Sequence, residues 1–296
     1  MCKKNLVSIF ILLLVAGCQH SPTRVFESHD YSGNRLSDKL GDPIVVTSKT
    51  IVLDARRPFD HTMFHLQGAK QLSWEEFTQP GALNGKLDSD LSKMARRFAR
   101  LGIEPDSEVV ITGYGKKGLG EEGRLAWTLY YLGVQNVQVA GIQYFKNGIT
   151  QKDSPVRKNM PYWDAKPSFT VLAEYADVRA VLSNPARASQ KNKTIIIDVR
   201  SKDEFFNRQT FKPIGVTPDI HAIHIPYPEF IDEQGRPNQE LAKKLLALGI
   251  KKSDRIVLIS NRGLRSAAGT FSLLSMGFKR AANFDGGWVE LKSKLN

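Results

Sequence analysis

The chain has 296 residues, a hydrophobic content of 41% and a formal net charge of +12. This length is enough for two domains of ordinary size, and the composition excludes a disordered chain and a chain that spans a membrane along most of its length. The Lys and Arg residues are scattered and form no nucleic-acid-binding motif, so we predict no nucleic-acid partner.

The first residues have the pattern of an export signal. A basic start is followed by an uncharged apolar run from Leu6 to Val15, which is too short to span a bilayer well and leads to small residues before Cys18. We therefore predict a signal peptide over residues 1–17. The sequence LVAGC at its end resembles the lipobox of bacterial lipoproteins, which implies cleavage before Cys18 and acylation of that cysteine. An uncleaved anchor helix and a plain secreted protein are the alternatives.

The predicted acylation places the protein in the bacterial cell envelope. Residues 18–43 are polar and lack strong periodicity, which fits a tether between the lipid and the first domain. Because Gln19 follows Cys18, the resemblance favours the outer membrane, with the protein facing the periplasm. Cys2 would leave with the signal and Cys18 would carry lipid, so the mature protein would have no thiol, disulfide or cysteine metal ligand. Its charge would attract anionic lipid or an acidic envelope protein, unless it serves solubility alone.

The rest of the chain contains two copies of one unit. The segment TIVLDARRPFD at 50–60 matches TIIIDVRSKDE at 194–204, with 144 residues between Asp54 and Asp198. A repeat of this length is too long for a solenoid and indicates the duplication of a whole domain. We predict a first domain over 44–150, a linker with three prolines over 151–168 and a second domain over 169–296.

Each copy alternates short apolar runs with amphipathic segments. The segments 91–102 and 240–249 have apolar residues at helical spacing and a glycine at the end. Short, nearly all-apolar strands flanked by helices predict an α/β fold in which each domain has a central parallel sheet covered on both faces. The predicted strands are Ile51–Leu53, Val109–Thr112 and Val137–Val139 in the first copy and Ile195–Ile197, Ile256–Ile259 and Ala281–Phe284 in the second.

The sequence LISNRGLRSAAG at 258–269 predicts an anion-binding loop at the carboxyl end of a strand, where α/β sheets bind ligands. The strand leads to a serine, a tight loop follows, and a helix of small residues begins at Ser266. Backbone N–H groups, the helix start and two guanidinium groups are suited to an oxyanion, a phosphate or a carboxylate. The alternative is a relic of the fold, packed by its own hydrogen bonds. The candidate residues are Ser260, Asn261, Arg262, Gly263, Leu264 and Arg265.

These motifs together carry a family resemblance. The order Asp-x-Arg, then Glu-Phe, then the loop, then FDGGW at 284–288 resembles the rhodanese superfamily, and the two-domain form resembles thiosulfate and mercaptopyruvate sulfurtransferases. The resemblance covers residues 44–296 and implies two tandem rhodanese-like domains, the first of the non-catalytic type. Active members carry a cysteine at the head of the second loop, which becomes a persulfide. Here Ser260 stands at that position, and Gly113 heads the longer first loop, so neither can form a persulfide.

We therefore expect a membrane-anchored envelope lipoprotein that lacks sulfurtransferase activity and binds an anion or a partner at the Ser260 loop, without a cofactor. One alternative is an enzyme of the sulfurtransferase class, of the thiosulfate or mercaptopyruvate type. Others are a hydrolase that uses Ser260 as its nucleophile, which would need a base, and a structural component of an envelope assembly.

Charged residues near the strand ends have a structural interpretation. Asp54 with Arg56, and Asp198 with Arg200, are predicted to form ion pairs that hold the end of a strand. Trp288 is predicted to fill the core or a domain interface, beside a tight turn at two glycines.

An insertion and two histidine pairs are further candidate sites. The second copy carries an insertion at 207–222, which we expect to border the loop or to offer a partner surface. Two histidine pairs have spacings that suit a metal, but no cysteine or carboxylate pattern accompanies them, so we predict no metal site. The pairs are His61 with His65 and His221 with His224.

Overall fold

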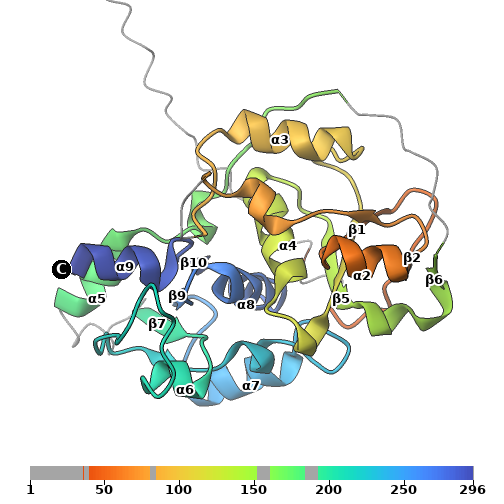
Figure 1. The fold of residues 1–296 in the computed structure, drawn as a ribbon. Coiled ribbons are helices and arrows are strands. Elements are labelled where there is room, and N and C mark those ends of the chain that lie inside the picture. The colour runs from red at the N-terminus through yellow and green to blue at the C-terminus, as the bar shows by residue number, and fades with distance from the viewer. Residues whose placement is uncertain (1–35, 37–39, 81–84, 152–160, 184–192, 296) are drawn as a thin grey trace, which may run out of the picture. The chain divides into compact units, whose positions relative to one another are not determined.

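A computed structural model describes residues 36, 40–80, 85–151, 161–183 and 193–295 (Figure 1). The predicted signal peptide over 1–17 and most of the predicted tether lie outside the described residues. All described residues belong to one compact unit. Within this part of the chain, no helix combines the length and the apolar character needed to cross a membrane.

The first sheet is parallel, with the strand order β3-β1-β4-β5. Its strands β1 and β4 pair with Ile51 opposite Val109, and every residue of both strands is buried. Buried apolar strands of this kind require cover on both faces. The strands are β1 (Ile51–Asp54), β3 (Lys70–Gln71), β4 (Val109–Gly113) and β5 (Val137–Gly141), and β2 (His65–Leu66) pairs antiparallel with β6 (Ile149–Thr150). The α-helices of this half are α2 (Pro58–Met63), α3 (Leu91–Arg100) and α4 (Glu121–Leu132).

The second sheet repeats this topology. Its order is β10-β9-β7-β8, so each strand has the same neighbours as its counterpart in the first sheet, as a duplication predicts. The strands are β7 (Thr194–Asp198), β8 (Ile223–His224), β9 (Arg255–Ile259) and β10 (Ala281–Asn283). The α-helices are α5 (Tyr175–Ser183), α6 (Lys202–Phe205), α7 (Gln239–Ala247), α8 (Leu264–Ser275) and α9 (Gly287–Leu295).

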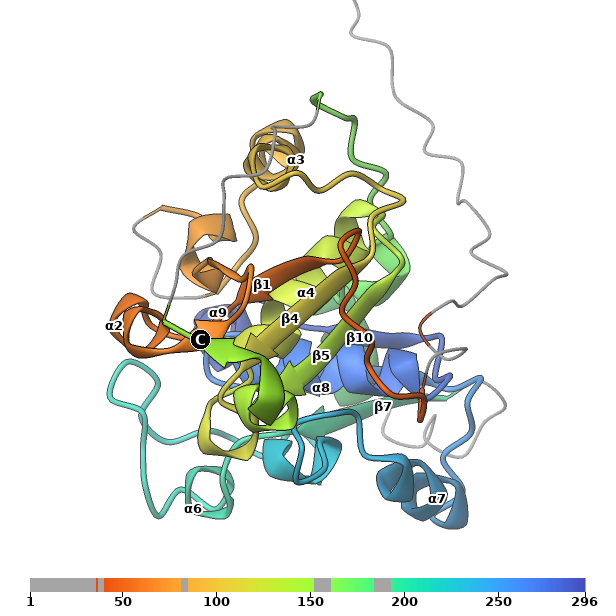
Figure 2. The same ribbon diagram turned by 90° about the vertical axis from the view of Figure 1, so that its right-hand side faces the viewer.

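A shared core joins the two sheets. Alternate residues of each central strand, such as Leu53 and Ile197, belong to one large buried cluster, while their neighbours belong to smaller clusters on the outer faces. The helices α4 and α8 lie side by side within the shared core (Figures 1 and 2). Their backbones approach so closely that a Cβ on Gly123 would lie 2.6 Å from the Cβ of Ala268.

The prediction of parallel sheets flanked by helices is confirmed, and all six predicted strands are present with ends shifted by one or two residues. One difference concerns the predicted linker, whose described part packs against the first half. Lys166 N–H donates to Leu132 O at 3.0 Å, and Ser168 N–H donates to Tyr131 O at 2.8 Å. These bonds occupy carbonyls that the end of α4 leaves without a partner inside the helix.

Candidate anion-binding site

The end of strand β7 is held by the predicted ion pair. The Asp198 carboxylate accepts hydrogen bonds from the Arg200 guanidinium and backbone N–H, and both side chains are buried. Trp288 Nε1 donates to Asp198 Oδ2 at 2.9 Å, and its ring lies 4.9 Å from the Arg200 guanidinium carbon. The pair Asp54–Arg56 repeats this arrangement in the first sheet. The predicted ion pairs and the buried position of Trp288 are therefore confirmed.

The loop after β9 enters α8 through Gly263. This glycine caps the helix with a φ of +70°, and a Cβ there would overlap the carbonyl of Asp285. Glycine therefore permits both the left-handed backbone and the close approach. The helix begins at Leu264, two residues earlier than the predicted start at Ser266. As a result, the N–H groups of Leu264 and Arg265 belong to the first turn of the helix, where no acceptor exists within the helix.

Carbonyl groups of the loop have hydrogen-bond donors, whereas its N–H groups have no acceptor among the described residues. Ser260 O accepts Trp288 N–H, and Gly263 O accepts Arg124 Nη1 at 3.0 Å and Asn283 Nδ2 at 3.2 Å. By contrast, the five N–H groups from Asn261 to Arg265 donate to no acceptor in the part of the chain that the structure describes. A run of unpaired N–H groups at a helix N-terminus is a typical oxyanion-binding arrangement.

Ser260 is buried at the head of this loop, and its hydroxyl contacts the helix. Its Oγ lies 3.0 Å from Ser266 Oγ and accepts Ser266 N–H at 3.3 Å. The two histidines of the second copy contact other groups: His224 Nε2 lies 2.9 Å from Arg200 O, and His221 is exposed beside Asp219. The described residues therefore do not form a Ser-His arrangement around Ser260.

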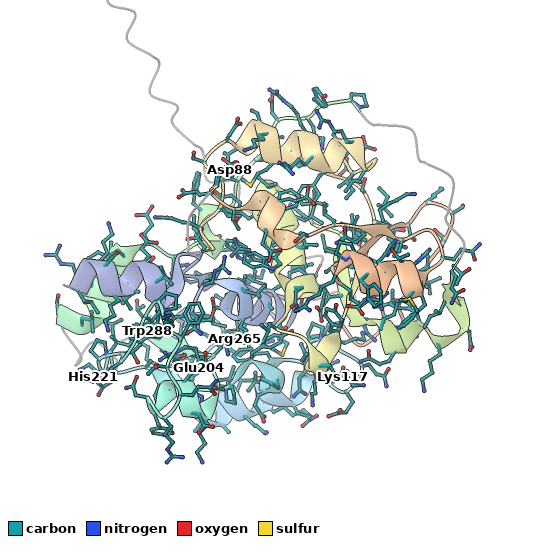
Figure 3. The ribbon with its side chains drawn as sticks, in the orientation of Figure 1. Asp88, Lys117, Glu204, His221, Arg265 and Trp288 are labelled. Atoms are coloured by element: carbon teal, nitrogen blue, oxygen red, sulfur yellow. The ribbon has the colours of Figure 1, made fainter. Side chains whose placement is uncertain are left out.

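Arg265 differs from its prediction, because its guanidinium already has an anionic partner. Nη1 and Nη2 donate to the two carboxylate oxygens of Glu204 at 2.7 and 3.0 Å, and Asn261 Nδ2 donates to the same carboxylate at 2.5 Å (Figure 3). Glu204 is placed there by a capping box with Ser201 at the start of α6. Sequence reasoning missed Glu204, although the pattern SKDE at 201–204 was the available signal.

Glu204 is held as a carboxylate. Burial alone would raise the pKa of Glu204, but the hydrogen bonds and charge of Arg265, with the Ser201 N–H and Asn261, lower it to about 2. The side chains of Arg265 and Asn261 are therefore engaged by this carboxylate, which leaves the loop's backbone N–H groups and Arg262 to be considered as contacts for an external anion.

We expect Glu204→Gln to lower the free energy of unfolding by about 1–3 kcal/mol at pH 7. Because the folded pKa lies below the unfolded value of about 4.5, the contribution is fully present above pH 4.5 and is lost as the pH falls from there toward 2. Urea unfolding of the parent and the variant across this range measures it. A difference that stays constant from pH 7 to pH 2 would contradict the assignment.

Arg262 extends from the loop toward the first half of the chain. Its guanidinium carbon lies 5.5 Å from the ring centre of Trp74, and its buried Nε has no hydrogen-bond partner. No ion pair of Arg262 is present among the described residues. Arg262 is thus the loop's cation that a ligand can still engage.

The first-copy loop is occupied by glutamate side chains from the start of α4. It begins at Gly113, where a Cβ would overlap the buried carboxylate of Glu122. Gly115 N–H donates to Glu122 Oε1 at 3.0 Å, and Leu119 N–H donates to the Glu121 carboxylate at 2.9 Å. Burial raises the pKa of Glu122 to about 8, against the hydrogen bond from Gly115. The first loop therefore provides its own Glu side chains as acceptors for its N–H groups, whereas the described residues around the second loop do not.

The histidine pair His61 and His65 and the insertion at 207–222 make contacts within the protein. His61 Nδ1 lies 2.9 Å from Asp54 Oδ2, and its ring stacks on His65. Among the described residues no cluster of three or more His, Cys, Asp or Glu side chains has an arrangement that suits a metal ion. The insertion at 207–222 packs against α9, where Lys292 Nζ donates to Ile214 O at 2.7 Å.

The fold and the loop together define a class of protein: a duplicated parallel α/β protein in which, among the described residues, a strand of the second sheet leads into a loop with unpaired backbone N–H groups. Residues 184–294 match the family model of the rhodanese-like domain. The second half of the chain is therefore similar to a rhodanese-like domain.

Comparisons with known proteins agree with this classification. The chain is 24% identical, over 86% of its length and 84% of the relative's, to "Putative thiosulfate sulfurtransferase SseA" of Mycobacterium tuberculosis and of Mycobacterium bovis. It is also similar to the anaerobic ergothioneine biosynthesis enzyme from Chlorobium limicola in complex with its natural substrate trimethyl histidine, and to EanB in complex with ergothioneine. For both structures the TM-score is 0.69 and the identity 18%, over 87% of this chain and 66% of the other, which shows a shared fold.

Proposed function

We propose that this chain is a lipid-anchored rhodanese-like protein of the bacterial cell envelope that binds a small oxyanion at the loop from Ser260 to Arg265 and transfers no sulfur. The observation that carries the proposal is the run of five N–H groups that have no acceptor among the described residues, headed by a serine rather than a cysteine. The first-copy loop, filled by Glu122, takes no part in binding.

The chemistry at the loop head supports binding over catalysis. A persulfide requires a thiolate that attacks a sulfur donor, and the Ser260 hydroxyl cannot form one. As a nucleophile for hydrolysis the hydroxyl would need a base, while its described partners are the hydroxyl and N–H of Ser266. The competing proposal is a sulfurtransferase, supported by the name of the SseA relatives.

The membrane anchor of this proposal rests on the sequence before the described residues. The apolar run and the lipobox-like end at Cys18 support export and acylation, and Gln19 supports the outer membrane. Acylated chains of this kind hold a protein at the bilayer without a spanning helix.

The proposal is tested by assaying the purified full chain with thiosulfate and cyanide. We expect no thiocyanate above the protein-free rate, and we expect thiosulfate or sulfate to shift the amide NMR signals of residues 261–265. The amides of residues 114–119 in the first-copy loop serve as the internal control and should not shift. Sustained turnover would overturn the binding-only function in favour of the sulfurtransferase, and unshifted amides at 261–265 would overturn the anion site.

A further inference from the structure

Basic side chains gather at one edge of the second sheet. The strands β10, β9 and β7 are parallel neighbours, so the segments that precede them meet where the strands begin. Each of these segments is basic: Lys193 precedes β7, Lys251 and Lys252 precede β9, and Lys279 and Arg280 precede β10. We call these five residues the basic edge.

Backbone hydrogen bonds hold the three segments side by side. Arg255 N–H donates to Lys193 O at 3.0 Å, Ile256 N–H donates to Arg280 O at 3.2 Å, and Arg280 Nη1 donates to Ser253 O at 3.1 Å. The basic edge is therefore one surface and not three separate features.

Within the described part of the chain, none of the five basic side chains forms an ion pair. Of the five residues, Lys193 is half-buried and the other four are exposed. The acidic residue within segments 248–256 and 276–281 is Asp254, which is buried and accepts the backbone N–H of Lys251 at 2.8 Å. Exposed like charges that lie on one surface produce a positive potential that favours an anionic partner.

The duplication provides an internal comparison. The first-copy segment 104–108 corresponds to 251–255, and there the exposed side chains include Glu104, Asp106 and Glu108. The segment before β5 likewise has Gln and Asn where the second copy has Lys279 and Arg280. The same fold is thus built with an acidic edge in one copy and a basic edge in the other, so the basic charge is not a requirement of the fold.

The start of the described chain lies near the same end of α8. Leu36 and Leu40 line a small cavity together with Phe271 and Ser275, the last residue of α8. From Ser275 the chain continues into Lys279 and Arg280 of the basic edge. Fully extended, the segment from Cys18 to Leu36 spans at most about 65 Å, so the predicted anchor limits how far this surface can be from a membrane.

We infer that the basic edge docks on an anionic phospholipid surface and orients the second domain against the membrane that carries the anchor. The inference rests on the proposed membrane anchoring for the choice of lipid over another anion. A Lys or Arg at such a surface strengthens association roughly fivefold, and the attraction falls off within about 10 Å at 0.1 M salt.

The test uses the full chain on vesicles of phosphatidylcholine, with or without phosphatidylglycerol, at 0.1 M salt. The proposed anchor at Cys18 should retain the chain on both vesicle types, so a difference between them reports the docking surface. Hydrogen exchange should slow several-fold at residues 249–255 and 277–281 on the anionic vesicles only. Lys251→Glu with Lys279→Glu should abolish this protection. The matched control, Arg100→Glu with Lys146→Glu, changes the net charge equally at exposed positions of the first half and should keep it.

The outcomes separate this inference from the proposed function. Equal exchange on both vesicle types, or protection that survives Lys251→Glu with Lys279→Glu, overturns the docking while the anchoring stands. Vesicle flotation measures whether the chain binds at all. A chain that floats only with anionic vesicles, with slowed exchange at the basic edge, overturns the anchoring and supports the docking. A chain that floats with neither overturns both. If polyglutamate in solution slows exchange at the basic edge as much as anionic vesicles do, the partner is an acidic protein and the proposal of an anionic phospholipid surface is wrong.

Discussion

Replacing Arg124 by methionine is expected to lower the free energy of unfolding by about 2–4 kcal/mol at pH 7. Arg124 belongs to the first copy, yet its buried guanidinium donates to Gly263 O in the second-copy loop at 3.0 Å and to Gly85 O at 2.5 Å. Methionine keeps much of the volume but leaves the Gly85 carbonyl without this donor. It also removes the cation whose charge favours the ionised form of buried Asp285.

The environment of Arg124 explains why this effect should be large. Burial lowers the pKa of Arg124 to about 10, against the charge of Asp285, and the guanidinium carbon lies 4.8 Å from the ring centre of Trp127. The comparison is Arg97→Met, which breaks the ion pair of a partly exposed arginine with Glu76 and should cost less than about 1 kcal/mol.

Chemical unfolding of both variants measures this difference, and hydrogen exchange provides a second readout. Arg124 and Asn283 both donate to the Gly263 carbonyl. Arg124→Met should therefore speed exchange, before global unfolding, at the hydrogen-bonded amides where the loop enters α8, which are those of Ser266 and Ala267. Equal stabilities of Arg124→Met and Arg97→Met, with unchanged loop exchange, would show that the first copy does not support the second-copy loop.

The strands and the position of the loop were predictable from sequence because each depends on local pattern. Runs such as IVL at 51–53 and VLI at 257–259 are apolar on both faces, and a strand, a glycine and a helix of small residues follow one another directly. The paired Asp and Arg at the strand ends are two residues apart, so their ion pairs were predictable too.

The state of the loop was not predictable in the same way, because it depends on contacts between distant residues. Glu204 and Arg265 are 61 residues apart, and Arg124 and Gly263 are 139 residues apart. The pattern showed that Arg265 follows the loop, but not that a capping-box glutamate would already occupy its guanidinium. Likewise, Gly113 indicated a loop without a nucleophile, whereas the Glu122 carboxyl group that fills this loop is placed there by the folding of α4.

We expect Ser260→Cys to create thiosulfate sulfurtransferase activity at least about 100-fold above that of the parent chain. The introduced thiol would stand at the head of a helix N-terminus with unpaired N–H groups, which lowers the pKa of a thiol and stabilises its anion. The thiolate would attack the outer sulfur of thiosulfate, forming a new S–S bond and releasing sulfite. Cyanide would then take that sulfur as thiocyanate and restore the thiolate.

The matched control is Ser266→Cys. Its side chain lies beside that of Ser260, with 3.0 Å between the two hydroxyl oxygens, and both side chains are buried, but Ser266 belongs to helix α8 and not to the loop head. It places a thiol a few ångströms from the same position without placing it at the loop head, so we expect neither turnover nor an added sulfur. The parent chain controls for Cys2 and Cys18, the two cysteines of the sequence.

The parent chain and Ser260→Cys differ in one atom, because the substitution exchanges the hydroxyl oxygen for sulfur and leaves the rest of the loop in place. Thiocyanate production, together with one added sulfur detected by mass spectrometry after thiosulfate alone, would mean that the N–H groups from Asn261 to Arg265 still form a functional anion site. A folded Ser260→Cys chain that gains neither would mean that the Glu204–Arg265 ion pair or the burial of the loop head closes the site. The oxyanion-binding proposal would then be wrong, because an anion reaches those N–H groups by the same path as thiosulfate.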